Sequence, residues 1–256
     1  MRLKQKVAVV TGAADGIGLA IGEAFLQEGA ILIAGDINAE KCRAEAGRLG
    51  ADGGVVRAVK CDVGVTADVN RMMEAAVSEF GRIDILVNNA AISIRGNIME
   101  MPESDWDQLM NTNLKSVYRT IKAALPHMIR QRSGSVINIA SAQAHRSWHD
   151  WTAYAAAKGA ILSMTNQLAG QFGEYNVRFN SLSPGAIMTP MNEERARNEG
   201  PDFLSESAQM HALKRMGTPR EVAMAAVFLA SEEASFILGS DIKVDGGLCT
   251  LPRQFE

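Results

Sequence analysis

Two side chains that could move a proton stand four positions apart, in Tyr154-Ala-Ala-Ala-Lys158. On a helix this spacing places both on one face. A nearby ammonium favours the phenolate, so Lys158 could lower the pKa of Tyr154 from about 10 toward neutrality. Ser141 precedes the pair by 13 residues and could hydrogen-bond an oxygen on which charge develops. Ser141, Tyr154 and Lys158 together could transfer a proton to or from an alcohol or ketone oxygen. A Tyr–Lys pair alone, however, is also a common surface contact.

A glycine-rich segment follows the first apolar run of the chain. The sequence Thr11-Gly12-Ala-Ala-Asp15-Gly16-Ile-Gly18 leads from a strand candidate directly into a helix candidate. Glycines allow a sharp turn and a close approach of backbone to a pyrophosphate, and the helix N-terminus offers N–H groups to that anion. A turn without a ligand is the alternative, but the strand–turn–helix context favours a dinucleotide. With the proton-transfer pair, this predicts hydride transfer between a secondary alcohol and a nicotinamide.

An aspartate at the end of the second apolar run bears on which dinucleotide binds. Asp36, in Gly35-Asp36-Ile37, lies about 20 positions after the glycines, where an adenosine ribose would be held. Its carboxylate can accept both ribose hydroxyls, whereas a 2′-phosphate would meet like charge. At about 4 Å and an effective dielectric near 20, that repulsion is on the order of 4 kcal/mol per pair of unit charges. The sequence therefore predicts NAD rather than NADP, unless Asp36 merely caps a surface turn.

Short apolar runs alternate with segments of helical periodicity along almost the whole chain. Such alternation predicts a parallel sheet with helices on both faces. We therefore expect an α/β fold in one Rossmann-type domain, residues 1–256, doubly wound and of about seven strands. The expected strands are 7–10, 31–34, 55–59, 83–87, 136–139, 177–182 and 242–244. The expected helices are 17–28, 39–49, 67–79, 104–130, 152–172 and 219–231.

Composition argues against a nucleic-acid-binding protein, a membrane-spanning protein and a metal site. A net charge of −3 offers no broad basic field for nucleic acid, and no run of about 18 apolar residues could cross a membrane. Cys42, Cys61 and Cys249 form no CxxC pair, which fits a reducing compartment, so we expect a cytoplasmic protein. His145 and His149 lack an aligned third ligand, so we expect no metal.

These motifs together resemble the short-chain dehydrogenase/reductase family, in its subunit length of roughly 250 residues. The resemblance covers nearly the whole chain. Single motifs would be weak evidence, but all of them in this order and spacing are highly specific. The matching features are Thr11-Gly-xxx-Gly16-Ile-Gly18, Asp62 after the third strand, Asn88-Asn89-Ala90, Asn113, Ser141, Tyr154-xxx-Lys158 and Pro184-Gly185.

The resemblance implies a role for each catalytic residue. Tyr154 would be the general acid/base, Lys158 would hold the nicotinamide ribose and lower the pKa of Tyr154, and Ser141 would position the substrate oxygen. Asn113 would keep a water that links the site to solvent, and Asn88 would stabilise the central sheet.

The implied cofactor contacts lie at the carboxyl ends of the expected strands, which is where open α/β sheets bind ligands. Asp62 and Val63 would contact the adenine. The residues after the sixth strand would line the nicotinamide side. The chain departs from the usual family pattern at Ala91, where a glycine is common, and at Ala140, where a serine is frequent. The implied contacts are Gly12, Asp15, Gly16, Ile17, Gly18, Asp36, Ile37, Asp62, Val63, Asn89, Ala90, Tyr154, Lys158, Pro184, Gly185, Ile187 and Thr189.

The stretch between Ser141 and Tyr154 borders the substrate in this family. It interleaves polar groups with tryptophans, which could hydrogen-bond hydroxyls and cover a sugar ring. We expect Ser141, Gln143, Trp148 and Tyr154 to contact a small-molecule substrate, with a sugar, polyol or hydroxy acid favoured. Packing or subunit contact is the alternative for Trp148 and Trp151.

Two other functions share these motifs in whole or part. A 3-oxoacyl thioester reductase would have every motif, but Arg130 and Arg132 are poor evidence for a docking patch, and Asp36 fits the usual NADPH badly. A non-catalytic NAD-binding regulator would typically have lost Tyr154 or Lys158. The resemblance also implies a homotetramer built through the expected helices 104–130 and 152–172. The polar segment 188–213 breaks the strand–helix rhythm, and we expect it to be a substrate lid.

Overall fold

The computed structural model describes residues 1–200 and 202–250. Seven parallel strands form one sheet in the order β3-β2-β1-β4-β5-β6-β7, which confirms the expected fold class. The strands are β1 (Val7–Thr11), β2 (Ile31–Asp36), β3 (Val55–Lys60), β4 (Ile85–Asn88), β5 (Gly134–Ile139), β6 (Val177–Pro184) and β7 (Asp241–Val244). The helices are α1 (Gly16–Gln27), α2 (Ala39–Ala51), α3 (Thr66–Phe80), α4 (Glu103–Met110), α5 (Ser116–Gln131), α6 (Thr152–Phe172), α7 (Pro190–Glu199), α8 (Phe203–Gln209) and α9 (Pro219–Ala230).

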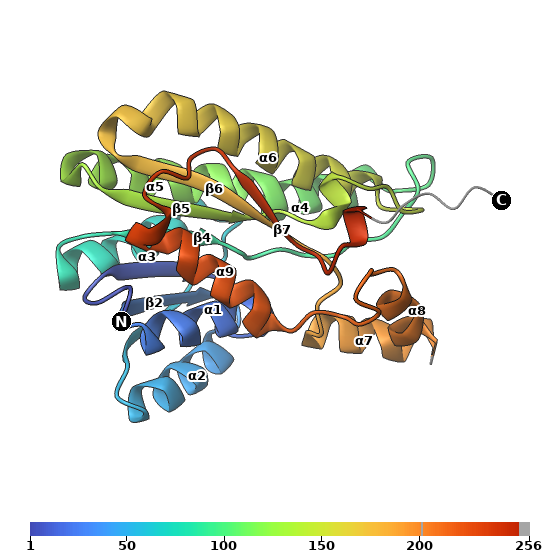
Figure 1. The fold of residues 1–256 in the computed structure, drawn as a ribbon, viewed down its shortest axis with the longest axis horizontal. Coiled ribbons are helices and arrows are strands. Elements are labelled where there is room, and N and C mark those ends of the chain that lie inside the picture. The colour runs from blue at the N-terminus through green and yellow to red at the C-terminus, as the bar shows by residue number, and fades with distance from the viewer. Residues whose placement is uncertain (201, 251–256) are drawn as a thin grey trace.

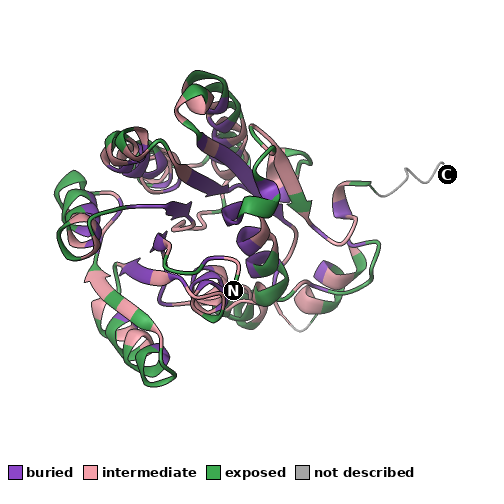
Figure 2. Cartoon of the chain, turned by 60° about the vertical axis from the view of Figure 1, so that its left-hand side comes forward, coloured by how far each residue is buried: buried purple, intermediate pink, exposed green. Residues whose placement is uncertain are grey.

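Helices cover both faces of the sheet, as Figure 1 shows. Helices α1, α2 and α9 pack on one face, and α3, α5 and α6 pack on the other. Along β1 the side chains alternate between these two cores: Ala8 and Val10 belong to the first, Val7 and Val9 to the second. The central strands are therefore apolar on both faces and buried, as Figure 2 shows.

A polar chain of hydrogen bonds runs through the second core and fixes the centre of the sheet. Asn138 on β5 accepts a hydrogen bond from Nδ2 of Asn88 at 2.8 Å and donates one to Oγ1 of Thr165 on α6, also at 2.8 Å. Thr120 on α5 donates to Oδ1 of Asn88 at 2.6 Å. Two strands and two helices are joined in this way, which supports the structural role expected for Asn88.

The expected helix 104–130 was wrong in one respect. The helical path is continuous, but a π-helical turn, Asn111–Lys115, separates α4 from α5. A π turn adds one residue to a turn without changing the apolar pattern on either side, so hydrophobic periodicity does not detect it.

The segment 188–213 is more ordered than its polar sequence suggests, because it contains α7 and α8. In Figure 1 these helices lie beside one end of the sheet, apart from the helices that cover its faces. Residue 201, within this segment, lies outside the described residues. The chain leaves the sheet after β6 and returns at Gly217, whose N–H donates to Ala186 O at 2.9 Å while its carbonyl accepts from Met188 N at 2.8 Å. A parallel bridge between Ile187 and Gly217 thus closes the base of the segment.

A buried histidine fastens the end of this segment to the sheet. His211, 1% exposed, accepts a hydrogen bond at Nε2 from Ala186 N at 3.1 Å, and its Nδ1 lies 2.8 Å from Ser207 O. A Cβ on Gly185 would lie 2.6 Å from that Nε2, so glycine is needed for the close packing. The helices are therefore anchored directly to the loop after β6.

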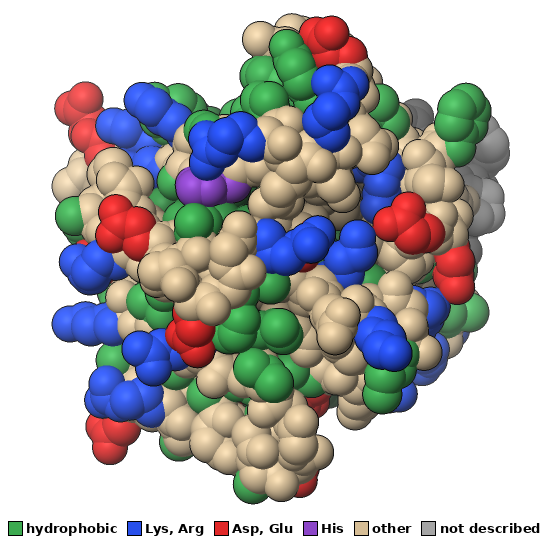
Figure 3. Space-filling model, turned by 90° about the vertical axis from the view of Figure 1, so that its left-hand side faces the viewer, with side chains coloured by type: hydrophobic (Ala, Val, Ile, Leu, Met, Phe, Trp, Pro, Cys, Tyr) green, Lys and Arg blue, Asp and Glu red, His purple; other side chains and the backbone are tan. Residues whose placement is uncertain are grey.

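At the opposite end of the molecule from α7 and α8, Figure 3 shows lysines and arginines interspersed with acidic side chains. None of the helices within the described residues combines the length and the apolar character needed to cross a bilayer.

Candidate functional site

A cavity of about 430 Å³ lies between the carboxyl ends of the central strands and the α7–α8 segment. It follows the point where strand order reverses, with β1 between β2 and β4, and such crevices bind ligands in open α/β sheets. Most of the expected cofactor residues line it. These are Gly12, Asp15, Gly16, Ile17, Asp36, Asn89, Ala90, Tyr154, Lys158, Pro184, Gly185, Ile187 and Thr189.

The glycine turn has the geometry that a pyrophosphate requires. Gly12 and Gly16 have φ values of +64° and +50°, a region that favours glycine. A Cβ on Gly18 would lie 2.0 Å from Gly12 O, so the turn closes only without a side chain there. Asp15 caps α1, its Oδ1 accepting from Gly16 N at 2.6 Å. The bare backbone and the helix N-terminus therefore fit a dinucleotide.

Asp36 is held in place by the backbone on both sides. Its Oδ2 accepts from Ala14 N at 3.0 Å, and its Oδ1 accepts from Asn38 N at 2.8 Å. The carboxylate lines the cavity, and each oxygen has further acceptor capacity for a ribose hydroxyl. The structure also places Lys41 against Asp15 as an ion pair. That pairing neutralises the charge of Lys41.

Lys158 is a buried cation that has no carboxylate partner among the described residues. Only 3% of it is exposed, and Nζ donates to Ile139 O at 2.7 Å. Burial lowers the pKa of its ammonium to about 8, because the charged form loses hydration. Small side chains on α6 leave room for this arrangement: Ala155, Ala156 and Ala157 separate it from the tyrosine.

Tyr154 shares the same face of α6, with its ring centre 5.5 Å from Nζ of Lys158. Burial raises the pKa of the phenol, whereas a hydrogen bond to Ser141 and the charge of Arg195 act to lower it. Burial has the largest effect, so the pKa of the phenol is raised overall. That Lys158 lowers this pKa remains an expectation. Proton acceptance by Tyr154 requires further positive charge beside it.

Ser141 and Asn113 occupy different environments. Ser141 follows β5, its Oγ accepts from Gln143 N at 3.1 Å, and it lines the cavity beside Tyr154. Asn113 is 1% exposed in the π-helical turn, where its amide both donates to Ile92 O and accepts from Ile92 N, each at 2.8 Å. Both the Oδ1 and the Nδ2 of that side chain are thus bonded to the backbone of Ile92. Asn113 therefore supports the loop after β4.

Several expected contacts lie outside the cavity walls. Ile37 is 64% exposed, so its side chain points to solvent beyond Asp36. Val63 is buried in the second core, and Asp62 accepts from Gly64 N at 2.8 Å. Both follow β3 and lie next to the end of β2. The expected site residues that do not line the cavity are the cofactor contacts Gly18, Ile37, Asp62 and Val63 and the catalytic residue Asn113.

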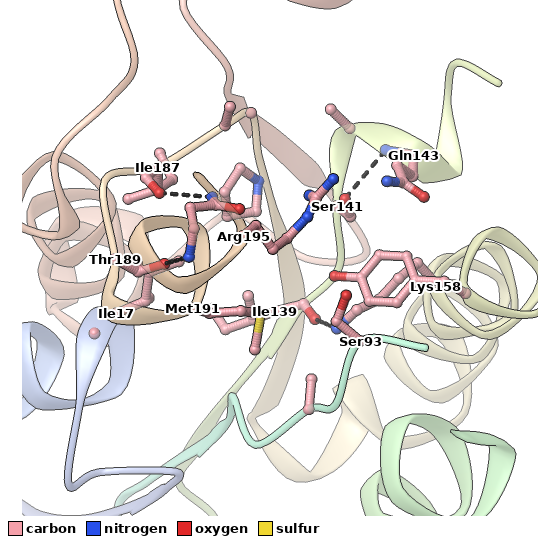
Figure 4. Close-up of a pocket in the computed structure, with 18 of the residues that line it drawn as sticks. Ile17, Ser93, Ile139, Ser141, Gln143, Lys158, Ile187, Thr189, Met191 and Arg195 are labelled. Carbon is pink, nitrogen blue, oxygen red and sulfur yellow. Dashed lines mark hydrogen bonds between the residues drawn. The ribbon is translucent and has the colours of Figure 1, made fainter. Parts of the chain in front are cut away.

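Arg195 on α7 lines the reacting end of the cavity, and sequence reasoning missed it. Figure 4 shows it reaching from α7 across the cavity in the direction of Ser141. Nε and Nη2 lie 2.9 and 2.8 Å from Glu199 Oε1. The cationic carbon lies 5.0 Å from the Trp151 ring centre and 4.7 Å from that of Phe203. Its polar surroundings in sequence gave no signal that this residue faces inward.

The expected substrate residues Gln143 and Trp148 also line the cavity. Trp148 donates from Nε1 toward the sulfur of Met210 at 3.4 Å. The side-chain Oε1 of Gln143 is buried and has no hydrogen-bond partner among residues 1–200 and 202–250. A buried oxygen without a donor costs about 1–3 kcal/mol, so a ligand hydroxyl here would be favourable. His145 instead lies 2.8 Å from Asp241 Oδ2.

Comparison with known proteins places the chain among oxidoreductases along its whole length. Residues 12–249 match the family described as Enoyl-(Acyl carrier protein) reductase. The chain is 39% identical over 253 residues to the 3-oxoacyl-(acyl-carrier-protein) reductase of Thermotoga maritima, which covers 97% of this chain and 99% of that protein.

Two solved structures share the fold. A protein of Burkholderia xenovorans described as a short-chain dehydrogenase/reductase has a TM-score of 0.94 and 36% identity, covering 98% of this chain and 99% of the other. The ligand-free aldohexose dehydrogenase of Thermoplasma acidophilum has a TM-score of 0.90 and 35% identity, covering 99% of this chain and 98% of the other.

Proposed function

The chain belongs to the short-chain dehydrogenase/reductase family, and on that premise we propose that it is an NAD-dependent dehydrogenase of secondary alcohols. It is an oxidoreductase acting on CH–OH groups, and the family uses nicotinamide cofactors. One observation carries the proposal: Ser141, Tyr154 and Lys158 line the same cavity as the glycine turn. A dinucleotide bound at the glycine turn and a substrate beside Tyr154 would therefore share one cavity.

Ser141, Tyr154 and Lys158 control the transfer of the substrate's hydroxyl proton. The glycine turn and Lys158 would hold a nicotinamide dinucleotide, which would supply the acceptor for a hydride from the carbinol carbon as the alcohol becomes a ketone. Tyr154 Oη accepts the hydroxyl proton, while Ser141 holds the substrate oxygen by a hydrogen bond. Lys158, fixed by Ile139 O, holds the ribose and supplies positive charge beside the phenol. In ketone reduction the same groups act in reverse.

Asp36 supports NAD as the cofactor. Its carboxylate is fixed by Ala14 and Asn38 and faces the cavity, so it could accept both hydroxyls of an adenosine ribose. The cation beside it, Lys41, is engaged with Asp15. A 2′-phosphate would therefore meet the negative charge of Asp36.

For the substrate we propose a sugar, a polyol or a hydroxy acid. The unpartnered Oε1 of Gln143 favours a ligand with a hydroxyl group, and Trp148 and Trp151 offer aromatic faces for its C–H surface. The Thermoplasma acidophilum relative is an aldohexose dehydrogenase, which agrees with this class.

The second candidate is a 3-oxoacyl thioester reductase, favoured by the Thermotoga maritima relative of that activity. It would require a surface for an acidic carrier protein. Arg130 and Arg132 offer little, since Arg130 contacts His127 and Arg132 donates to Glu174 O. The non-catalytic alternative is set aside, because the chain is an oxidoreductase by family.

Three further proposals concern the molecule as a whole. The segment 188–213 acts as a lid, since α7 and α8 form one wall of the cavity. The chain assembles as a homotetramer through α4, α5 and α6, where Tyr118 is half exposed. Its three cysteines are free, which fits the cytoplasm.

The test of function is NADH formation by the purified protein with NAD and a panel of sugars, polyols, hydroxy acids and hydroxyacyl thioesters. We expect turnover with the first three classes and its loss in Tyr154→Phe, which keeps the ring but removes the proton carrier. Turnover of thioesters alone, with NADPH, would support the second candidate. Tight NAD binding without turnover of any substrate would overturn the proposal.

A further inference from the structure

The charges on the cavity wall are separated along its length. Four charged side chains line it: Asp15 and Asp36 at the glycine turn, and Lys158 and Arg195 at the reacting end. Within the described part of the chain, therefore, only cations line the end where the substrate reacts. Both acidic groups lie where the adenosine half of the cofactor is expected. Such a field favours a substrate with negative charge.

Arg195 is held rigidly with one side left for a ligand. Its Nε and Nη2 atoms form an ion pair with Glu199. The aromatic rings of Trp151 and Phe203 make cation–π contacts with the guanidinium. Nη1 has no hydrogen-bond partner among residues 1–200 and 202–250. Glu199 is not part of the cavity wall. A guanidinium fixed in this way loses little side-chain entropy when it binds a ligand.

Arg195 also lies close to the reacting atoms. Its charge acts on the phenol of Tyr154, and Figure 4 shows it extending from α7 in the direction of Ser141. A group bound to Arg195 would thus belong to the same small molecule whose carbinol oxygen is held by Ser141 and Tyr154. An arginine in a sheltered cavity suits a carboxylate, because two of its N–H groups can bind both oxygens.

We propose that Arg195 binds the carboxylate of the substrate, so that among secondary alcohols this enzyme prefers hydroxy acids. The inference rests on the proposed dehydrogenase function and selects one of its three substrate classes. Arg195 is then a specificity-determining residue carried by α7. A neutral polyol could occupy the cavity but would offer no carboxylate to the Nη1 side of Arg195, which Glu199 does not engage. The competing explanation is a purely structural role for Arg195, in which its contact with Trp151 only holds α7 in place.

The experiment compares each secondary hydroxy acid with its primary amide, which has nearly the same shape but no charge. Wild type, Arg195→Gln, Arg195→Lys and Arg197→Gln are assayed with NAD. Arg197 is the matched control, an exposed arginine on the same helix. Removing Arg195 also raises the pKa of Tyr154, but that effect is common to acid and amide. The ratio of their kcat/KM values therefore isolates the carboxylate contact.

We expect wild type to favour the acid over its amide by roughly 10- to 100-fold, mostly through KM. The preference should vanish in Arg195→Gln, persist in part in Arg195→Lys and remain unchanged in Arg197→Gln. An equal loss for acid and amide, or a wild type that prefers polyols, would overturn the inference while leaving the dehydrogenase function intact.

Binding without chemistry separates the two proposals. An unreactive carboxylate lacking the hydroxyl, titrated in the presence of NAD and followed by tryptophan fluorescence, should bind wild type and Arg197→Gln but not Arg195→Gln. If no substrate turns over yet this pattern holds, the dehydrogenase proposal fails and the carboxylate site stands. If no carboxylate binds to wild type, the site is refuted.

Discussion

Nζ of Lys158 lies 5.5 Å from the centre of the Tyr154 ring, yet its hydrogen bond goes to Ile139 O. The backbone of β5 thus fixes where the cation lies, independently of the tyrosine. Burial acts in opposite directions on the two groups: it raises the pKa of the phenol and lowers that of the ammonium. The pair is therefore poised to hold a proton on Tyr154 and to lose one from Lys158.

This arrangement predicts the pH dependence of ketone reduction. Reduction needs a proton on both Tyr154 and Lys158. The pKa of Lys158 is lowered to about 8, so its ammonium is present below that pH and is lost above it, while the raised pKa keeps the phenol protonated. We expect kcat/KM for reduction to be level below pH 8 and to fall above it. A profile that stays level to about pH 10 would refute this assignment.

Lys158→Met should make the protein more stable and inactive. A pKa of about 8 against 10.5 corresponds to roughly 3 kcal/mol of unfavourable burial, which methionine avoids at similar volume. We expect the free energy of unfolding at pH 7 to rise by about 1–3 kcal/mol, because the lost bond to Ile139 offsets part of the gain.

The sign of the pH dependence provides a second check on Lys158. Because its folded pKa lies below the unfolded value, the unfolded state binds more protons between about pH 8 and 10.5, and wild-type stability rises across that window. The difference between variant and wild type should therefore shrink there. Lys4→Met, an exposed control, should change neither activity nor stability.

Asp36→Asn should weaken discrimination against NADP. The substituted amide still accepts one backbone N–H but no longer repels a 2′-phosphate. We expect the ratio of kcat/KM for NAD over NADP to fall by roughly 100- to 1,000-fold, as removal of one close like-charge pair predicts. Asp52→Asn, exposed after α2, serves as the control. A wild type that already prefers NADP would contradict the role of Asp36.

Asn138→Leu should destabilise the fold without a direct effect on the cavity. Asn138 is 0% exposed and bridges Asn88 and Thr165, so leucine would remove two buried hydrogen bonds and leave Nδ2 of Asn88 unpaired. We expect urea denaturation to show a loss of about 2–4 kcal/mol. Asn198→Leu, exposed on α7, should be nearly neutral. Equal stability of both variants would show that the polar chain does not hold the sheet.

The lid proposal predicts protection from proteolysis. Arg197 is exposed on α7 and is a site for trypsin. If α7 and α8 close over bound ligands, NAD and substrate together should slow cleavage there by roughly 10-fold, because cutting requires local opening. Equal cleavage rates with and without ligands would count against a lid.

The sequence was sufficient to predict the alternating strands and helices and the glycine-rich turn. Short apolar runs located the strands, including β3 and β7, which are not buried, and the glycines between Gly12 and Gly18 located the turn. The π-helical turn before Ser116 escaped detection, because a single added residue is too small a change for the spacing of apolar residues to reveal. Arg195 escaped as well: what distinguishes it from Arg197 is which side of α7 meets the cavity, and that depends on how the whole segment packs.

The bridge between Ile187 and Gly217 brings the two ends of the α7–α8 segment together. A segment whose two ends lie side by side can be replaced without changing the order of the strands in the sheet. The part of substrate choice that we assign to Arg195 is thereby carried by one exchangeable segment. Transplanting residues 188–216 from a relative with another substrate is then a modest edit, and one along which evolution could diversify specificity while Tyr154 and Lys158 stay where they are.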